Sequence, residues 1–385
     1  MSSSLRSQEP TASRRAEGSI RFATFNISFY RKSEGELKKE LQEKPESAQP
    51  RKVAEIIQRV RPDVLLLNEF DYDKNGEALA AFQKNFLEVA QGEQAPIKYP
   101  YSYVGPVNTG VDTKIDLDGD GKTGTGNDCY GFGRYPGQYG MAILSRYPID
   151  QDNVRTFQRF RWTDMPNHQM PFKVGTQDPY YSDEAIEVFR LSSKSHWDVP
   201  IKLNNQDSIH FLVAHPTPPV FDQEEDRNGR RNHDEIRMFA DYVTPDKADY
   251  LYDDQGGRGG LAAGVKFVIA GDMNADPNDG DSSMSAANQL TEHPLINHSI
   301  DPSSSGGAHY AKSQGGKNLE HKGPANTDTG DFGDSNVGNL RIDYCLPSKN
   351  LELIQAGVFW PKPGEPGAKL INASDHRMVW IDLKK

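Results

Sequence analysis

The sequence predicts one α/β domain, because short strand-like apolar segments recur along the chain and a helical segment lies between the first two of them. Hydrophobic residues make up 35% of the 385 residues, which is enough to bury a large core. No internal repeat and no change in composition separates a second domain. Residues 1–18 offer almost nothing to bury, so we expect a flexible tail and then one domain over residues 19–385.

The first predicted strand is the segment IRFATFNISFY, in which apolar and polar residues alternate and Asn26 stands near the C-terminal end. A helix is predicted over residues 51–61, because apolar residues recur there at helical spacing until Pro62 ends the pattern. The apolar run at residues 63–68 predicts a buried strand that leads directly to Glu69.

The later elements are predicted from the same patterns. A helix is expected over residues 233–243, where Ile236, Phe239 and Ala240 share one face. Short apolar runs predict strands at residues 140–145, 208–214, 266–270, 341–346 and 378–383. Segments without periodicity predict long loops, which often carry function, at about 91–137, 150–200 and 276–338.

The composition argues against several classes of protein. The net charge of −11 does not suggest a broad basic surface for a nucleic-acid backbone. Cys129 and Cys345 are too few for a disulfide scaffold and wrongly spaced for a zinc ribbon, although one disulfide or two free thiols both fit. The chain has neither an apolar run of roughly 18 residues nor the apolar region of a secretory signal, so we expect no membrane span or signal peptide in it.

Polar residues stand at or just beyond the ends of most of the predicted strands. Because strand ends on one edge of a sheet converge, we expect these side chains to share a site. Carboxylate and amide oxygens suit Mg2+ or Mn2+, whereas zinc would normally recruit more His or Cys. The pattern therefore predicts metal-dependent phosphate chemistry. The residues are Asn26, Glu69, His215, Asp272, Asn274, Asp343, Asp375 and His376.

The motifs that contain these residues resemble, in order, those of the endonuclease/exonuclease/phosphatase superfamily. They are TFNIS, DVLLLNEFD, YGMAILSRYPI, VAHPTPP, GDMNAD, RIDYCL and SDH, and the resemblance covers roughly residues 20–385. It implies a four-layer α/β/β/α sandwich with two mostly antiparallel sheets and the site at one end. That fold serves several substrates, so it does not identify the ester.

The resemblance also implies roles for the individual residues. Glu69 would be the principal metal ligand, assisted by Asn26 and Asp375, and Asp272 would orient or deprotonate the attacking water. Asn274 would donate a hydrogen bond to the phosphoryl oxygens, His215 and His376 would stabilise the charge that develops on them, and Asp343 would fix the tautomer of His376.

Each residue alone has a simpler interpretation. GDMN could be a strand followed by a turn, and Glu69 could be a solvated loop carboxylate. Asp375 could cap a helix, and His376 could be a surface histidine. Asp343 could form a structural salt bridge with Arg341 or Arg377.

A second acidic pattern is IDLDGDGKTGTGND, in which Asp116, Asp118 and Asp120 alternate before Gly121. This spacing matches the first half of a calcium loop of the EF-hand type and predicts a structural Ca2+ site. The twelfth position holds Asn127 in place of a bidentate Glu, so a plain acidic turn is the alternative.

Two polar segments flank the His215 motif, and each supplies one candidate for contact with a substrate phosphate. His196 lies in SSKSHWDVP, and Arg231 lies in DRNGRRNHDE. A salt-bridge network with Asp226, Asp234 and Glu235 is the alternative.

The sequence as a whole predicts a monomeric metal-dependent hydrolase of a phosphodiester or phosphomonoester in a small molecule or lipid headgroup. An extracellular or periplasmic location fits a weak calcium loop. The first alternative is an extracellular nuclease that cleaves DNA or RNA. The second is a catalytically silent binding module, which should lack at least one of Glu69, Asp272, Asp375 and His376, and all four are present.

Overall fold

A computed structural model describes residues 15–385. Most of the predicted tail lies outside these residues. Arg15 is described, and its guanidinium donates to the carboxylate of Asp63 at 2.7 Å. The structure therefore begins before β1 (Ser19–Phe29), with an ion pair to the start of the second strand.

The first sheet has six strands in the order β12-β13-β1-β2-β4-β3. Its central strands β1 and β2 run parallel, and the other neighbours run antiparallel. The strands besides β1 are β2 (Val64–Phe70), β3 (Tyr101–Val104), β4 (Met141–Ser145), β12 (Leu353–Val358) and β13 (Val379–Lys384).

The second sheet has five strands in the order β11-β8-β7-β6-β5. Only β7 and β8 are parallel neighbours. The strands are β5 (Arg155–Thr156), β6 (His196–Lys202), β7 (Ser208–Ala214), β8 (Phe267–Asp272) and β11 (Asp343–Pro347). A separate two-stranded ribbon joins β9 (Gly330–Asp331) and β10 (Asn339–Leu340).

The two large sheets pack face to face through an apolar core. Phe22 of β1 and Phe211 of β7 meet across it, with ring centroids 5.4 Å apart. A second core lies between the outer face of the first sheet and its helices, and a third lies between the second sheet and α5. The predicted four-layer sandwich with two mostly antiparallel sheets is thus confirmed.

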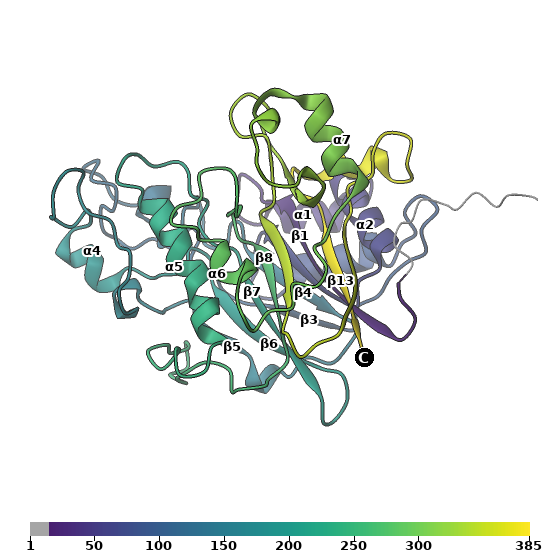
Figure 1. Cartoon of the computed structure of the whole chain (residues 1–385), viewed down its shortest axis with the longest axis horizontal. Coiled ribbons are helices and arrows are strands. Elements are labelled where there is room, and N and C mark those ends of the chain that lie inside the picture. The colour runs from purple at the N-terminus through teal and green to yellow at the C-terminus, as the bar shows by residue number, and fades with distance from the viewer. Residues whose placement is uncertain (1–14) are drawn as a thin grey trace, which may run out of the picture.

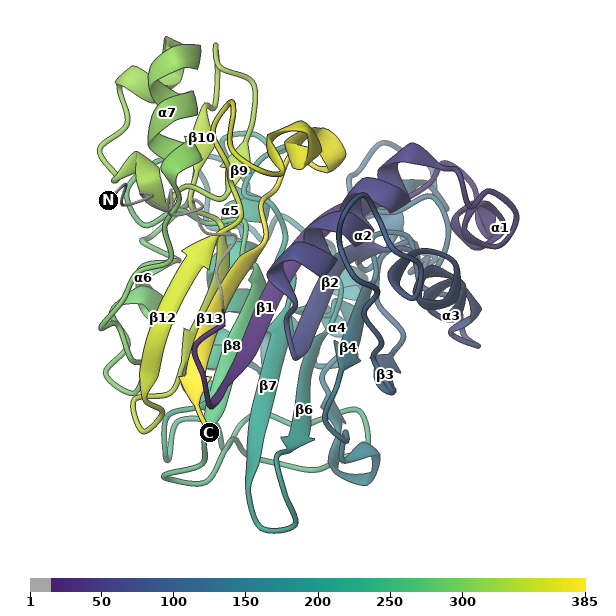
Figure 2. The same ribbon diagram turned by 90° about the vertical axis from the view of Figure 1, so that its right-hand side faces the viewer.

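The helices cover the outer faces. Figure 1 shows α5 and α6 on one side of the sheets and α2 on the other. Figure 2 shows α7, β9 and β10 gathered beyond one end of β12 and β13. The α-helices are α1 (Glu36–Glu43), α2 (Ala48–Val60), α3 (Glu77–Phe82), α4 (Asp183–Val188), α5 (Arg227–Tyr242), α6 (Asn288–Thr291) and α7 (Ser305–Gln314).

Three sequence predictions need correction. The helix predicted at residues 233–243 in fact begins at Arg227, and the prediction missed its first six residues because they show no apolar periodicity. The segment 150–200 is not wholly a loop, because it contains β5, α4 and the first five residues of β6. The loop at 276–338 likewise contains α6 and α7.

Two further findings bear on the sequence predictions. Cys129 and Cys345 are both buried free thiols, so the disulfide alternative is wrong. Within residues 15–385, no helix is long and apolar enough to cross a membrane.

Candidate active site

The topology brings the predicted site residues to one end of the sandwich. In the first sheet, parallel pairing aligns Asn26 with Asn68, so Asn26 and Glu69 emerge at the same edge. In the second sheet, His215 follows β7, and Asp272 ends the parallel strand β8. Asp343 starts the antiparallel strand β11 opposite Asp272. His376 precedes β13, whose start pairs with β1 near Asn26.

The carboxylate of Asp272 is the centre of the cluster and joins the two sheets. Its Oδ2 accepts a hydrogen bond from Asn26 Nδ2 at 3.0 Å. The same oxygen lies 3.3 Å from His215 Nε2 and 3.7 Å from His376 Nε2. Three residues from three different strand ends therefore converge on one oxygen atom.

A second carboxylate orients His376. Asp343 Oδ2 lies 2.9 Å from His376 Nδ1 and accepts a hydrogen bond from Thr329 Oγ1 at 2.8 Å. The alternative that Asp343 pairs with an arginine is wrong, since Arg341 binds Asp301 and Arg377 binds Asp331. Asp343 thus takes the geometry of a histidine orienter.

The cluster is strongly polarised. Burial alone would lower the pKa of His376, but the adjacent carboxylates of Asp343 and Asp272 raise it well above its usual value. Burial alone would raise the pKa of Asp272, but His376 and His215 hold it well below its usual range. Burial, with the nearby Lys194 ammonium, lowers the pKa of His215 to about 4. At neutral pH, His376 is therefore an imidazolium and His215 is neutral.

Glu69 and Asp375 lie on the first-sheet side of the cluster. Burial raises the pKa of Glu69 to about 7, and Asp375 and Asp272 add to the rise against the opposing effect of His376. Asp375 is exposed, and its Oδ1 accepts hydrogen bonds from Ser28 Oγ at 3.0 Å and Ser374 Oγ at 3.3 Å. Two carboxylates, those of Glu69 and Asp375, are therefore close enough to affect each other on this side of the cluster.

The residues present fit a divalent cation. Glu69 and Asp375 supply two carboxylates, and Asn26 supplies an amide oxygen, which is the hard donor set that Mg2+ and Mn2+ prefer. A positive charge at this position would offset the burial of Glu69 and its repulsion by Asp375 and Asp272, which together raise its pKa. The structure also brings ligand atoms of Asp272, Asp343 and His376 within 4.8 Å of one another.

Asn274 is held beside the cluster by its own backbone. Its φ of 51° lies in the left-handed region, which Asn tolerates better than most residues. Its backbone N–H donates to Asp272 Oδ1 at 2.9 Å, and its Nδ2 donates to the carbonyl of Pro216 at 3.1 Å. The side-chain amide retains a second hydrogen for another acceptor.

His196 and Arg231 have structural contacts, so the prediction that they touch substrate is corrected. The His196 ring is buried between Ser192 Oγ and the carbonyl of Glu235. Arg231 is buried and donates to the carbonyls of Leu191, Arg190 and Tyr130. The hydrogen bonds of both side chains join α5 to the segment that precedes β6. The alternative of a surface salt-bridge network is not what is found.

The predicted calcium loop does gather its carboxylates. Asp116, Asp118 and Asp120 have ligand atoms within 4.8 Å of one another. Asp116 also accepts backbone N–H groups from Gly119 at 2.7 Å and Gly121 at 2.8 Å. This geometry fits both a calcium loop and a turn that is stabilised by its own hydrogen bonds.

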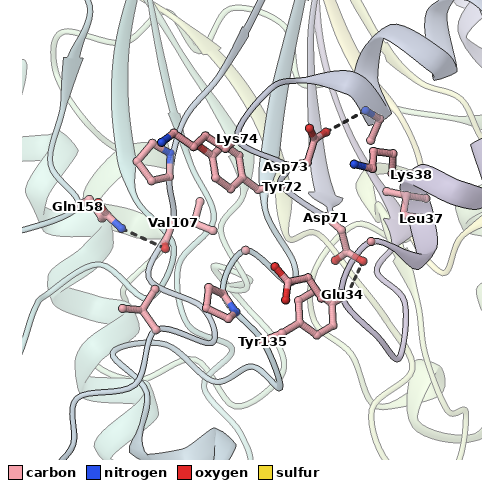
Figure 3. Close-up of a pocket in the computed structure, with 16 residues that line it drawn as sticks. Glu34, Leu37, Lys38, Asp71, Tyr72, Asp73, Lys74, Val107, Tyr135 and Gln158 are labelled. Atoms are coloured by element: carbon pink, nitrogen blue, oxygen red, sulfur yellow. Dashed lines mark hydrogen bonds between the residues drawn. The ribbon is translucent and has the colours of Figure 1, made fainter.

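A cavity of about 330 Å³ lies near the end of β2. In Figure 3, Asp71 and Tyr135 stand together on its wall. Asp71 accepts a hydrogen bond from Tyr135 at 2.6 Å and another from the backbone of Tyr139 at 3.1 Å. Asp71 therefore fixes Tyr139, whose ring contacts that of Tyr30 at a centroid distance of 4.8 Å. None of the residues that line this cavity belongs to the cluster.

Three polar residues of the site escaped the sequence analysis. Thr329 lies in a segment interpreted as a loop, and no motif marks it. Ser28 follows Asn26 within the first motif, but its contact with Asp375 depends on the meeting of the two chain ends. Lys194 stands two residues before His196 in a segment that the sequence did single out.

Comparisons with known proteins give a family and several structural relatives. A profile described as "Endonuclease/Exonuclease/phosphatase family" matches residues 23–376. No curated protein matches the chain. An endonuclease/exonuclease/phosphatase from Beutenbergia cavernae is 17% identical, with 96% of this chain and 72% of that chain covered and a TM-score of 0.49.

Two other solved structures are similar to this chain. A family protein from Leptotrichia buccalis is 13% identical, with 95% of this chain and 100% of that chain covered and a TM-score of 0.46. A beta toxin from Staphylococcus aureus with bound magnesium ions is 14% identical, with 95% of this chain and 100% of that chain covered and a TM-score of 0.44.

Proposed function

The chain belongs to the endonuclease/exonuclease/phosphatase family, and on that basis we propose that it hydrolyses a phosphodiester or phosphomonoester of a small or lipid-like molecule with a divalent cation. The family acts on phosphate esters in general. We propose in addition the class of ester and the role of each residue. The observation that carries it is the convergence of Asn26, His215 and His376 on one oxygen of Asp272.

Glu69, Asn26 and Asp375 would hold the cation, for which Mg2+ and Mn2+ are the candidates. When bound, the cation supplies Lewis-acid polarisation of a phosphoryl oxygen. These three residues also leave the Asp272 side of the cluster free for the attacking water.

Asp272 orients the water and is a weak base, because its two histidine neighbours hold its pKa low. His376 has the complementary character. As an imidazolium fixed by Asp343, it can donate to the phosphoryl oxygens as their negative charge grows. Asn274 adds a neutral donor from its free amide hydrogen.

His215 takes a different role from the one the family resemblance implies. A neutral His215 donates from Nε2 to Asp272, so its Nδ1 is an acceptor, and that buried atom has no partner among the described residues. We therefore assign His215 to the positioning of Asp272, and the stabilisation of transition-state charge to His376.

The acidic character of the chain favours a small or lipid-like ester over nucleic acid. A net charge of −11 repels a polyanion, whereas a single phosphate group is attracted only by the local site. The nuclease remains the second candidate because the same cluster suits any phosphodiester.

The test is hydrolysis of p-nitrophenyl phosphate, bis-p-nitrophenyl phosphate, a phospholipid and plasmid DNA, each with Mg2+, Mn2+ or EDTA. We expect turnover of at least one small or lipid ester, dependent on the cation. His376→Ala should lower kcat by about 100- to 1,000-fold, the usual effect of removing one preorganised donor. Turnover of DNA alone would replace the substrate proposal with the nuclease. No turnover of any ester would favour the silent binding module.

A further inference from the structure

Lys194 places a cation beside the cluster. It lies two residues before β6, whose first residue His196 pairs with Ala214, the residue before His215. The carbonyl of Lys194 accepts a hydrogen bond from the backbone N–H of Asn108 at 2.8 Å, and this bond holds the backbone of Lys194 in position. The side chain therefore starts from the same edge of the second sheet as His215.

This lysine is buried but lacks a partner. Only 7% of its surface is exposed. Among residues 15–385, its ammonium forms no hydrogen bond and no ion pair. The carboxylate of Glu235, its strongest charged neighbour, is engaged by the backbone N–H groups of Ser193 and Thr217, at 2.6 Å each.

Three other buried cations among the described residues bind protein groups. Arg21 binds Asp382 at 2.6 Å, Arg377 binds Asp331 at 2.8 Å, and Arg231 donates to backbone carbonyls. The largely buried Lys194 has no such protein partner for its ammonium, which costs free energy.

The charges around Lys194 belong to the site. Burial lowers its pKa, against the effect of the carboxylates of Glu235, Glu69 and Asp272. The charge of Lys194 also lowers the pKa of His215. The register at the start of β6 and these charge effects both place Lys194 beside the cluster, and its three N–H donors suit phosphate oxygens.

We propose that Lys194 is a substrate-contacting residue, whose ammonium donates hydrogen bonds to the non-bridging oxygens of the bound phosphoryl group from the β6 side of the site. This inference rests on the proposed function. It assigns Lys194 a share of phosphate affinity in addition to the cation and His376.

The test compares Lys194→Met, which keeps the length of the side chain and removes its charge, with Lys202→Met as a matched control. Lys202 is the last residue of β6 and forms an ion pair with Asp150 at 3.0 Å. It pairs with Ser208, the first residue of β7, whereas the cluster lies at the opposite end of these strands. Binding of inorganic phosphate to the Mn2+-loaded protein is measured by calorimetry, together with kcat/KM and the melting temperature.

We expect Lys194→Met to weaken phosphate binding by about 10- to 100-fold, the effect of losing one hydrogen bond to a charged group. Its melting temperature should equal or exceed that of the wild type, since an unpaired buried charge is removed. Lys194→Arg should recover part of the affinity. Lys202→Met should bind phosphate as the wild type does.

Phosphate affinity within twofold of wild type in Lys194→Met would overturn the inference. So would an unfolded or clearly less stable variant, because that result assigns the ammonium a structural role. Failure of the proposed function is a separate result. In that case the wild type hydrolyses no ester, while the phosphate titration still reports on Lys194.

Discussion

Replacing Glu69 by Gln should stabilise the metal-free protein at pH 8 and abolish turnover. Burial, with Asp375 and Asp272 nearby, raises the pKa of Glu69 from 4.5 to about 7. The folded state therefore holds this proton more tightly than the unfolded chain does. An ionised Glu69 destabilises the fold, and Gln mimics the neutral form.

The magnitude follows from the shift. A rise from 4.5 to about 7 corresponds to roughly 3 kcal/mol at about 1.4 kcal/mol per pKa unit. Glu69 keeps partial solvent contact, which screens the charges, so we expect a gain of about 2 kcal/mol. The cost of ionisation is absent well below pH 4.5, grows from about pH 4.5 to pH 7, and is constant above pH 7.

The assay is urea unfolding of both proteins in EDTA at several pH values from 5 to 8. The advantage of Glu69→Gln should shrink to roughly a quarter at pH 5. Added Mg2+ at pH 8 should stabilise the wild type more than the variant, because a cation that binds only the folded state shifts the equilibrium. Glu352→Gln, at an exposed surface pair, is the control and should change stability little. A variant that is less stable at pH 8, or an advantage that does not depend on pH, would refute the reasoning.

Three other predictions concern separate parts of the molecule. Asp343→Asn removes the charge that raises the pKa of His376, so kcat should fall about 100-fold or more and the alkaline limb of its pH profile should move to lower pH. Asp118→Asn should abolish the rise in melting temperature that Ca2+ causes in Mn2+-saturated protein, with kcat unchanged; an equal rise in both proteins contradicts the calcium loop. Asp382→Asn leaves buried Arg21 without its carboxylate and should cost about 3–5 kcal/mol in urea unfolding, with normal kcat in the folded fraction.

The sequence predicted most strands because burial on both faces gives continuous apolar runs, as in residues 64–67 and 267–270. It failed where polar side chains are buried by specific partners. The first turns of α5 are an example, since Arg231 and Asn232 bury their polar groups against carbonyls that come from distant segments. Such contacts leave no periodic signal.

The candidate site shows the same division. Residues within motifs, such as Asp272 and His376, could be named in advance because the motifs follow strands. Lys194 and Thr329 could not, because their positions depend on how the loops return to the edge of the sheets. His196 was the candidate in SSKSHWDVP for contact with substrate. Strand alternation instead places its ring against that of Phe239 in α5, with the ring centroids 4.8 Å apart.

The backbone at the site indicates how a cluster drawn from two sheets stays together. Ser28, Glu69, Tyr139 and Asn274 all have φ between 51° and 58°, a conformation that is unfavourable for residues other than Gly and Asn. Each such residue costs roughly 1 kcal/mol and persists only where the surroundings enforce it. All four stand where a strand ends or begins, and all border the cluster or the Tyr30–Tyr139 contact. The strands are fixed by the core between the sheets, so the strained turns can direct side chains across the edge without loosening the fold. Glycine at position 69 would relieve the strain but remove the carboxylate, which is why a charged residue occupies a conformation that its side chain disfavours.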